Sequence, residues 1–180
     1  MNDSRPPTFL FCLMVVLGAL RCVHVYPQLP DIMASHFTGR GIPNGWQPKP
    51  AFFLLIGVVI VVSAIPAFIV PRRLPAMPTD RINLPNKSYW LAPERKEETW
   101  RFFRAQMAWW GCALLILLLY TMSLAINANL PSIGYFNWQG MWYALGGFLL
   151  FTTLWIVHLQ RHFHNVPQTL VASTSGSWHK

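Results

Sequence analysis

Few residues outside the apolar stretches of this sequence could do chemistry, and two of them lie close together in the segment 26–50. Asp31 and His36 are the only carboxylate and the only imidazole in that segment. An acid and an imidazole can act as a general acid–base pair or as two ligands of a metal ion. Five residues apart, they do not share a face of a short helix, and only His24 is close enough in sequence to add a ligand. We therefore expect neither catalysis nor a bound metal, and a membrane metalloenzyme using Asp31 and His36 is the alternative.

The remaining histidines and the cysteines give weaker signals. His158 and His162 stand four residues apart, which places both on one face of a helix, but no cysteine or carboxylate lies nearby in sequence. Three cysteines, Cys12, Cys22 and Cys112, all fall within apolar runs and form no CxxC pattern. We interpret them as small apolar residues and expect no disulfide, no zinc and no cofactor.

Composition indicates a membrane protein. The chain is 53% apolar and only 11% charged, whereas an ordinary soluble domain carries about 25% charged residues. Four apolar runs come near the roughly 20 residues that a spanning helix needs: residues 8–25, 51–70, 107–126 and 140–159. The predicted fold is all-α, a polytopic integral membrane protein with four transmembrane helices in one membrane domain, residues 1–180. Because no acidic residue lies inside a span, ion-coupled transport is disfavoured, and a small transporter or transporter subunit remains an alternative.

The net charge of +8 is placed asymmetrically, which argues for topology rather than for nucleic acid binding. Segments on one side contain two basic residues, Arg40 and Lys49. Segments on the other side contain eleven: Arg5, Arg72, Arg73, Arg81, Lys87, Arg95, Lys96, Arg101, Arg104, Arg161 and Lys180. Cytoplasmic loops carry the excess of Lys and Arg. We therefore predict that both termini are cytoplasmic and that the segments 26–50 and 127–138 lie outside.

The outer segment 26–50 is expected to be folded rather than a tether. Asp31 predicts an N-cap for a short helix over residues 32–37 that ends near Gly39. The run Pro43-Asn44-Gly45 predicts a turn in which Asn and Gly adopt positive φ. Four apolar side chains are expected to dock this loop on the membrane surface or on the helix ends: Ile32, Met33, Phe37 and Trp46.

The inner segment 72–104 divides at Pro93. Several prolines predict an extended first part, whereas Pro93 and the glutamates after it predict the start of one long helix that continues through the third span to Asn127. Tyr89 and Trp90 lie beside charges, so this part is expected to be an interfacial anchor or a docking site for a cytoplasmic partner. The tail 166–180 is expected to be disordered.

Within the spans, three features have predicted roles. Pro66 should kink the second span near its inner end. Arg21 should reach the headgroups from the outer end of the first span, or else face the interior of the bundle. Small residues in the fourth span form a stripe that allows close approach by a helix of this chain or of another copy: Gly140, Ala144 and Gly147.

Two blocks of sequence resemble a known family. The first, in the outer segment, comprises Leu29, Pro30, Asp31, His36, Phe37, Gly39, Gly41, Pro43, Asn44, Gly45, Trp46 and Lys49. The second, in the inner segment, comprises Asn83, Pro85, Asn86, Lys87, Tyr89, Trp90, Pro93, Glu94 and Arg95. Together they resemble the bacterial membrane-protein family called domain of unknown function 1648, over about residues 10–105. That domain also forms the N-terminal part of SdpI-type immunity proteins.

The resemblance implies a non-enzymatic protein of the bacterial cytoplasmic (inner) membrane. It implies immunity to a membrane-active peptide toxin or signalling through partner binding. The implied partners are the lipid bilayer and a peptide toxin or a cytoplasmic protein, and oligomers could form through Gly140, Ala144 and Gly147.

Overall fold

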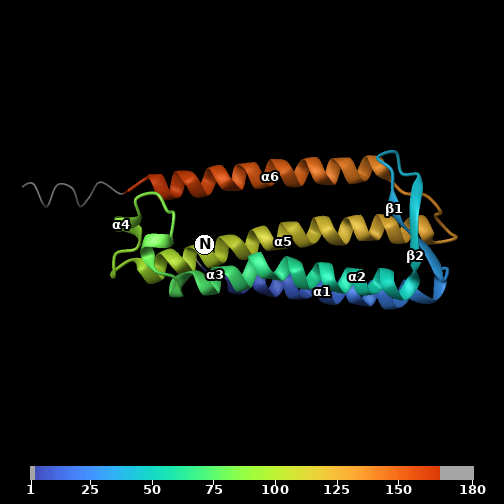
Figure 1. The fold of residues 1–180 in the computed structure, drawn as a ribbon, viewed down its shortest axis with the longest axis horizontal. Helices are drawn as coiled ribbons and strands as arrows, with labels where there is room; N and C mark the ends of the chain where they lie inside the picture. Colours follow the sequence, from blue (N-terminus) through green and yellow to red (C-terminus); the bar gives the residue numbers. More distant parts are fainter. Residues whose placement is uncertain (1–2, 167–180) are drawn as a thin grey trace, which may run out of the picture.

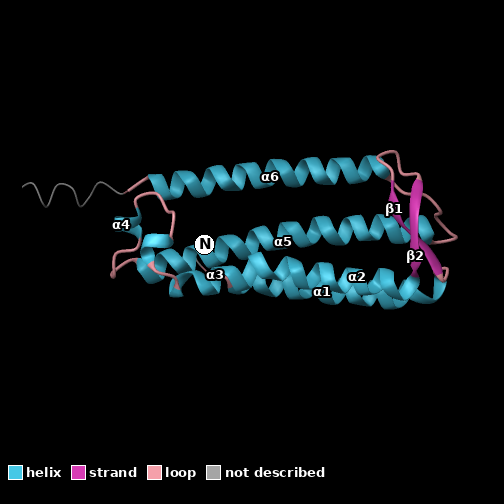
Figure 2. Ribbon diagram, viewed as in Figure 1, coloured by secondary structure: helices cyan, strands magenta, loops and turns pink. Residues whose placement is uncertain are grey.

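A computed structural model describes residues 3–166, and the predicted tail from residue 167 onward lies outside the described residues. The long helices run side by side, with a two-stranded hairpin across one end of the bundle (Figures 1 and 2). We call this the hairpin end, and the opposite end, which carries residues 74–95, the basic end. The main elements are α1 (Arg5–Val25), β1 (Ile32–Phe37), β2 (Pro43–Pro48), α2 (Lys49–Ala64), α3 (Val70–Arg73), α4 (Lys87–Trp90), α5 (Lys96–Asn129) and α6 (Trp138–His164).

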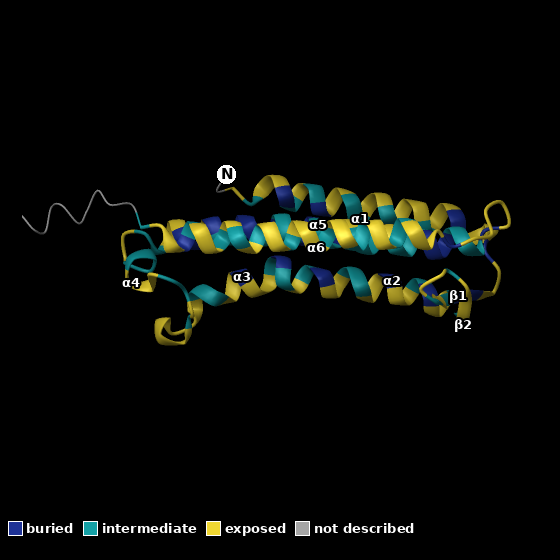
Figure 3. Ribbon diagram, turned by 90° about the horizontal axis from the view of Figure 1, so that it is seen from above, coloured by how far each residue is buried: buried dark blue, intermediate teal, exposed yellow. Residues whose placement is uncertain are grey.

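Four helical segments are long and apolar enough to cross a membrane: Arg5–Gln28, Lys49–Ala76, Lys96–Asn129 and Trp138–His164. Each contains one of the four predicted spans. Many large apolar residues of the helices are exposed, and exposed residues run along each long helix in Figure 3. In a bilayer these side chains face hydrocarbon rather than water. The prediction of a helical multi-pass membrane protein is therefore confirmed, with a small sheet added.

Pro66 interrupts the second span, as predicted. A π-helical turn, Ile65–Ile69, separates α2 from α3, because proline has no N–H to continue the α-helical bonding. The helix does not end at Pro71 but runs on through α3 to a 3-10 turn at Leu74–Ala76. Gly111 of α5 packs against the π-turn, where an added Cβ would collide with that of Ala67.

Helix α5 is the centre of the bundle and packs against α1, α2, α3 and α6. Its 34 residues span about 50 Å at roughly 1.5 Å per residue, so the predicted long third helix is confirmed. It starts at Lys96 rather than Pro93, because residues 91–95 form turns. The preceding segment is not extended as predicted: it forms 3-10 turns and the short helix α4.

Helix α6 runs along the top of Figure 1 and packs against α5. Its small-residue stripe faces α5 within the same chain, because Gly140, Ala144 and Gly147 line a groove of about 590 Å³ between the two helices. An added Cβ on Gly140 would collide with the hydroxyl of Tyr120, whereas one on Gly147 would meet nothing within 4 Å. The small residues thus permit close contact between α5 and α6 at Gly140 and leave space between the helices at Gly147.

Buried apolar side chains concentrate at the hairpin end. Met33 of β1 is fully buried, and Phe52 and Leu124 pack around it from α2 and α5. A second, smaller cluster forms along the bundle from Phe11, Cys112 and Leu115. The three cysteines are free thiols. The larger cluster packs the hairpin against the helices.

Candidate recognition site

The segment 26–50, predicted to lie outside, folds as a β-hairpin. Residues 32–37 form strand β1, which pairs antiparallel with β2 in the register Ile32↔Pro48, Met33↔Gln47 and Ala34↔Trp46. The predicted short helix over these residues is therefore wrong. An isolated helix of six residues is unstable, whereas the chain reversal that follows supplies a pairing strand and lets β1 bury Met33 and Ala34.

The reversal lies at residues 38–42 and not at Pro43-Asn44-Gly45 as predicted. The N–H of Thr38 donates to the carbonyl of Ile42 at 2.8 Å, and the N–H of Gly41 donates to the carbonyl of Thr38 at 2.9 Å. Gly41 supplies the positive φ of 78° that the turn requires. Gly45 instead lies in β2 opposite His36, where an added Cβ would stand 2.9 Å from the Cβ of His36.

Asn129, at the end of α5, ties β1 to the bundle. Its Oδ1 accepts from the N–H of Ala34 at 2.8 Å, and its Nδ2 donates to the carbonyl of Ala34 at 2.8 Å. The same Nδ2 donates to the carbonyl of Ala125 at 2.8 Å. One amide therefore satisfies both backbone groups of Ala34, as a neighbouring strand would.

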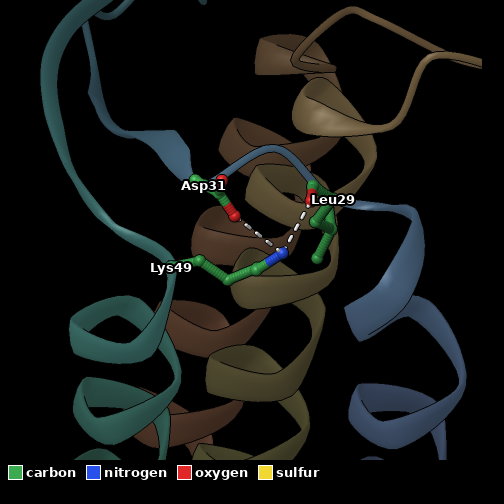
Figure 4. Close-up of polar contacts among 3 residues, drawn as sticks. All are labelled: Leu29, Asp31 and Lys49. Carbon is green, nitrogen blue, oxygen red and sulfur yellow. Dashed lines mark hydrogen bonds and ion pairs between the residues drawn. The ribbon is translucent and has the colours of Figure 1, made fainter.

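Lys49 joins the base of the hairpin to the first turn of α2. Its Nζ donates to the carbonyl of Leu29 at 2.9 Å and lies 3.4 Å from Oδ1 of Asp31 (Figure 4). The ammonium also stands 4.9 Å above the ring of Tyr26. The side chain of Lys49 is 13% exposed and that of Asp31 is 97% exposed. Asp31 is thus the exposed partner of a mostly buried cation, and not the helix cap that was predicted.

Aromatic contacts dock the tip of the hairpin. The ring of Phe37 stacks on Phe136 at 4.3 Å, and the indole of Trp142 donates to the carbonyl of Gly39 at 3.1 Å. Of the four side chains predicted to dock this loop, Met33 packs against α2 and α5, and Phe37 packs against the α5–α6 connection. Ile32 and Trp46 remain 58% and 60% exposed.

The structure does not bring Asp31 and His36 together. Asp31 lies at the base of the hairpin, and Nδ1 of His36 contacts Oδ1 of Asn44 at 2.5 Å nearer the tip. Five residues of strand separate them, about 16 Å at roughly 3.3 Å per residue. Within residues 3–166, no three His, Cys, Asp or Glu side chains gather closely enough to hold a metal ion.

The edge of strand β2 that faces away from β1 is not paired with another strand among the described residues. Both backbone groups of Ala34 turn away from β2 to meet Asn129, so Ala34 and Trp46 form a non-hydrogen-bonded pair. The N–H and C=O of Trp46 therefore point to the opposite edge. Within the described residues the sheet has only two strands. The hairpin thus offers a strand edge beside the exposed side chains of Trp46 and Ile42.

The inner sequence block forms a cap for α6 at the basic end. Asn86 adopts a left-handed conformation with φ of 50°. Its Nδ2 donates to the carbonyls of Phe163 and His164 at 3.1 and 2.9 Å, and the indole of Trp90 donates to the carbonyl of Phe163 at 2.9 Å. These donors satisfy carbonyls that the last turn of a helix leaves free. The ring of His162 stacks on Trp90, at 4.9 Å.

The rest of this block builds the loop around that cap. Tyr89 lies beneath the guanidinium of Arg95, 4.0 Å from it, and Lys87 begins α4. Pro93 and Glu94 lie in the turns before α5. Asn83 lines a small pocket with Trp100, and Pro85 is half-buried. The block therefore positions α6 within the chain.

Sequence reasoning missed several residues that fix these contacts. Asn129 and Trp142 bond the hairpin to helices distant in sequence. Arg21 of α1 bonds Oδ1 of Asn127 on α5 at 2.8 Å, so it connects two helices at the hairpin end. The only signal in the sequence was that a polar residue stands at the end of an apolar run. The spacing of residues does not show which groups such a residue bonds.

Comparison with known proteins gives one match. The family model described as "Domain of unknown function (DUF1648)" matches residues 13–62, which cover most of α1, the hairpin and most of α2. The matched range is shorter than the expected 10–105 and leaves out the inner block. No curated protein and no solved structure matches the chain. This multi-pass membrane protein therefore carries a DUF1648 domain at residues 13–62, built around the anchored hairpin.

Proposed function

We propose that this chain is a non-enzymatic protein of the bacterial cytoplasmic membrane whose hairpin binds an extended polypeptide on the outer side. The role favoured by the resemblance to SdpI-type proteins is immunity to a membrane-active peptide toxin. Orientation is supported by the charges, with eleven basic residues at the termini and the inner segment against two in the hairpin segment. In this orientation a peptide approaching the membrane from outside meets the hairpin first.

The observation that carries the proposal is a fixed hairpin with an unpaired edge. Asn129, Lys49, Phe136 and Trp142 hold it against the helix ends, so little conformational freedom is lost on binding. An exposed strand edge recruits an extended peptide through main-chain hydrogen bonds, and adjacent side chains select it. Trp46 supplies both kinds of contact, since its backbone faces the edge and its ring is exposed.

Protection of living cells tests the proposal. A bacterial strain sensitive to membrane-active peptides, expressing the full chain, should survive at least one of a panel of synthetic membrane-active peptides better than the strain with an empty vector. Trp46→Ala should reduce that protection. Tyr135→Ala removes an aromatic side chain that is similarly exposed, 66% against 60%, at the same end but outside the hairpin, and should leave protection intact. Survival that is unchanged by the wild-type chain across the panel would refute the immunity role.

A further inference from the structure

Helix α6 runs from the hairpin end to the basic end (Figure 1) and is held mainly at its two ends. Of its 27 residues only Phe163, in the last turn, is buried. Between its ends it lies beside α5 across the apolar groove of about 590 Å³, where an added Cβ on Gly147 would meet nothing within 4 Å. Contact with α5 along this stretch includes a bond of 3.3 Å from the indole of Trp110 to the hydroxyl of Thr152, and that indole packs against two aromatic rings of α6. The middle of α6 is therefore lightly packed, as is typical of the parts of a protein that move.

The first two turns of α6 are held by the tip of the hairpin. The indole of Trp142 donates to the carbonyl of Gly39 at 3.1 Å. Gly41 lies so close to Trp138 that an added Cβ would stand 3.3 Å from the indole ring. The connection just before α6 also stacks on β1 through two phenylalanine rings, 4.3 Å apart. A displacement of the hairpin tip therefore acts directly on the start of α6.

The last turn of α6 is held by the loop 83–90. Asn86 donates to two of its backbone carbonyls at 3.1 and 2.9 Å, and the indole of Trp90 donates to one of them at 2.9 Å. The ring of His162 stacks on Trp90 at 4.9 Å and on Phe102 of α5 at 4.0 Å. Because an N–H···O hydrogen bond is lost beyond about 3.5 Å, a shift of the last turn by roughly 1 Å opens this cap. The two sequence blocks therefore contact opposite ends of one helix.

We propose that α6 couples the hairpin to the loop 83–90 across the membrane, so that a displacement of the hairpin tip shifts α6 past α5 and opens the cap at the basic end. An α-helix transmits such a shift along its axis because its backbone hydrogen bonds are internal. Helix shifts of about 1–2 Å accompany known switching transitions, and the groove beside Gly147 leaves room for one. In the open state Asn86 and Trp90 have lost their acceptors and can bond a partner at the basic end. The coupling is a property of the chain itself and does not depend on the hairpin binding a peptide.

Amide hydrogen exchange of the full chain in detergent tests the coupling. Trp142→Phe removes the donor to Gly39 and keeps most of the ring. It should speed up exchange in the last turn of α6 about three- to tenfold, although about 33 Å of helix separates Trp142 from His164. Trp155→Phe is the matched control, because the same substitution on the same helix removes an indole N–H that has no partner among the described residues. Trp155 is about 20 Å nearer the cap than Trp142, yet this variant should leave exchange at the last turn unchanged.

Coupling between two sites acts in both directions, so the reverse experiment is a second test. Asn86→Ala should speed up exchange at the hairpin tip, where the N–H groups of Thr38 and Gly41 bond across the turn. Asn83→Ala, in the same loop but without bonds to α6, should not. If Trp142→Phe does not fold, this direction decides the test. Unchanged exchange at the last turn of α6 in a folded Trp142→Phe protein, an equal effect of Trp155→Phe, or an unchanged hairpin tip in Asn86→Ala would overturn the proposal.

Discussion

Asn129 shows how one amide side chain can attach a hairpin to a membrane helix. It satisfies the N–H and C=O of Ala34, a residue that is only 8% exposed. Asn129→Ala should therefore destabilise the protein by about 2–3 kcal/mol, because it leaves two nearly buried backbone groups unpaired. Thermal unfolding in detergent measures the effect.

The control for that variant is Asn127→Ala, two residues earlier in α5. It removes only an exposed bond to Arg21 and should cost less than about 1 kcal/mol. Equal losses from the two variants would show that the contact of Asn129 with β1 does not stabilise the fold.

The sequence predicted a positive φ at Gly45. In the structure the position instead needs glycine because of its close neighbour. Its position opposite His36 leaves no room for a side chain. Gly45→Val should destabilise the hairpin by about 1–3 kcal/mol through overpacking, and tryptophan fluorescence during thermal unfolding would measure it. Gly57→Ala on α2, where an added Cβ meets nothing within 4 Å, should not destabilise. A Gly45→Val protein as stable as wild type would contradict the close contact with His36.

Among the elements, α6 depends on contacts at its two ends. At the basic end, Asn86 and Trp90 bond the carbonyls of Phe163 and His164. Asn86→Ala should increase the rate of amide hydrogen exchange in the last turn of α6, because the last carbonyls lose their donors and the turn opens more often. Asn83→Ala, in the same loop but without these bonds, should leave exchange at that turn unchanged. Faster exchange in both variants would indicate general loosening of the loop instead of a cap.

The helices were predictable from sequence and the hairpin was not. Runs of about 20 apolar residues identify spans directly, because each helix satisfies its own backbone within the bilayer. The six residues of β1 have no such independence, since their conformation depends on pairing with β2 and on burying Met33 against α2 and α5. The residues of the two sequence blocks could be named from the sequence. Their partners Asn129, Trp142 and Phe163 lie 73–103 residues away, a separation over which spacing carries no information.

At the scale of the whole molecule, orientation in the membrane decides which surface meets a partner. Reporter fusions after Gly45 and after Ile133 should report the outside, and fusions after Asp80 and after Ser175 should report the cytoplasm, because basic residues concentrate on the latter side. Alkaline phosphatase and fluorescent-protein activities of paired fusions measure this. If the fusion after Gly45 reported the cytoplasm, the hairpin would lie on the wrong side of the membrane to meet an incoming peptide.

The central claim, that the edge of β2 pairs with an extended polypeptide, is tested most directly by comparing two substitutions at Trp46 in the protection assay. Both remove the indole, but only Trp46→Pro also removes the N–H that faces the free edge. With both proteins present in the membrane at the wild-type level and equally stable to heat, Trp46→Pro should protect cells less than Trp46→Ala. Equal protection by the two variants would contradict strand pairing at this edge.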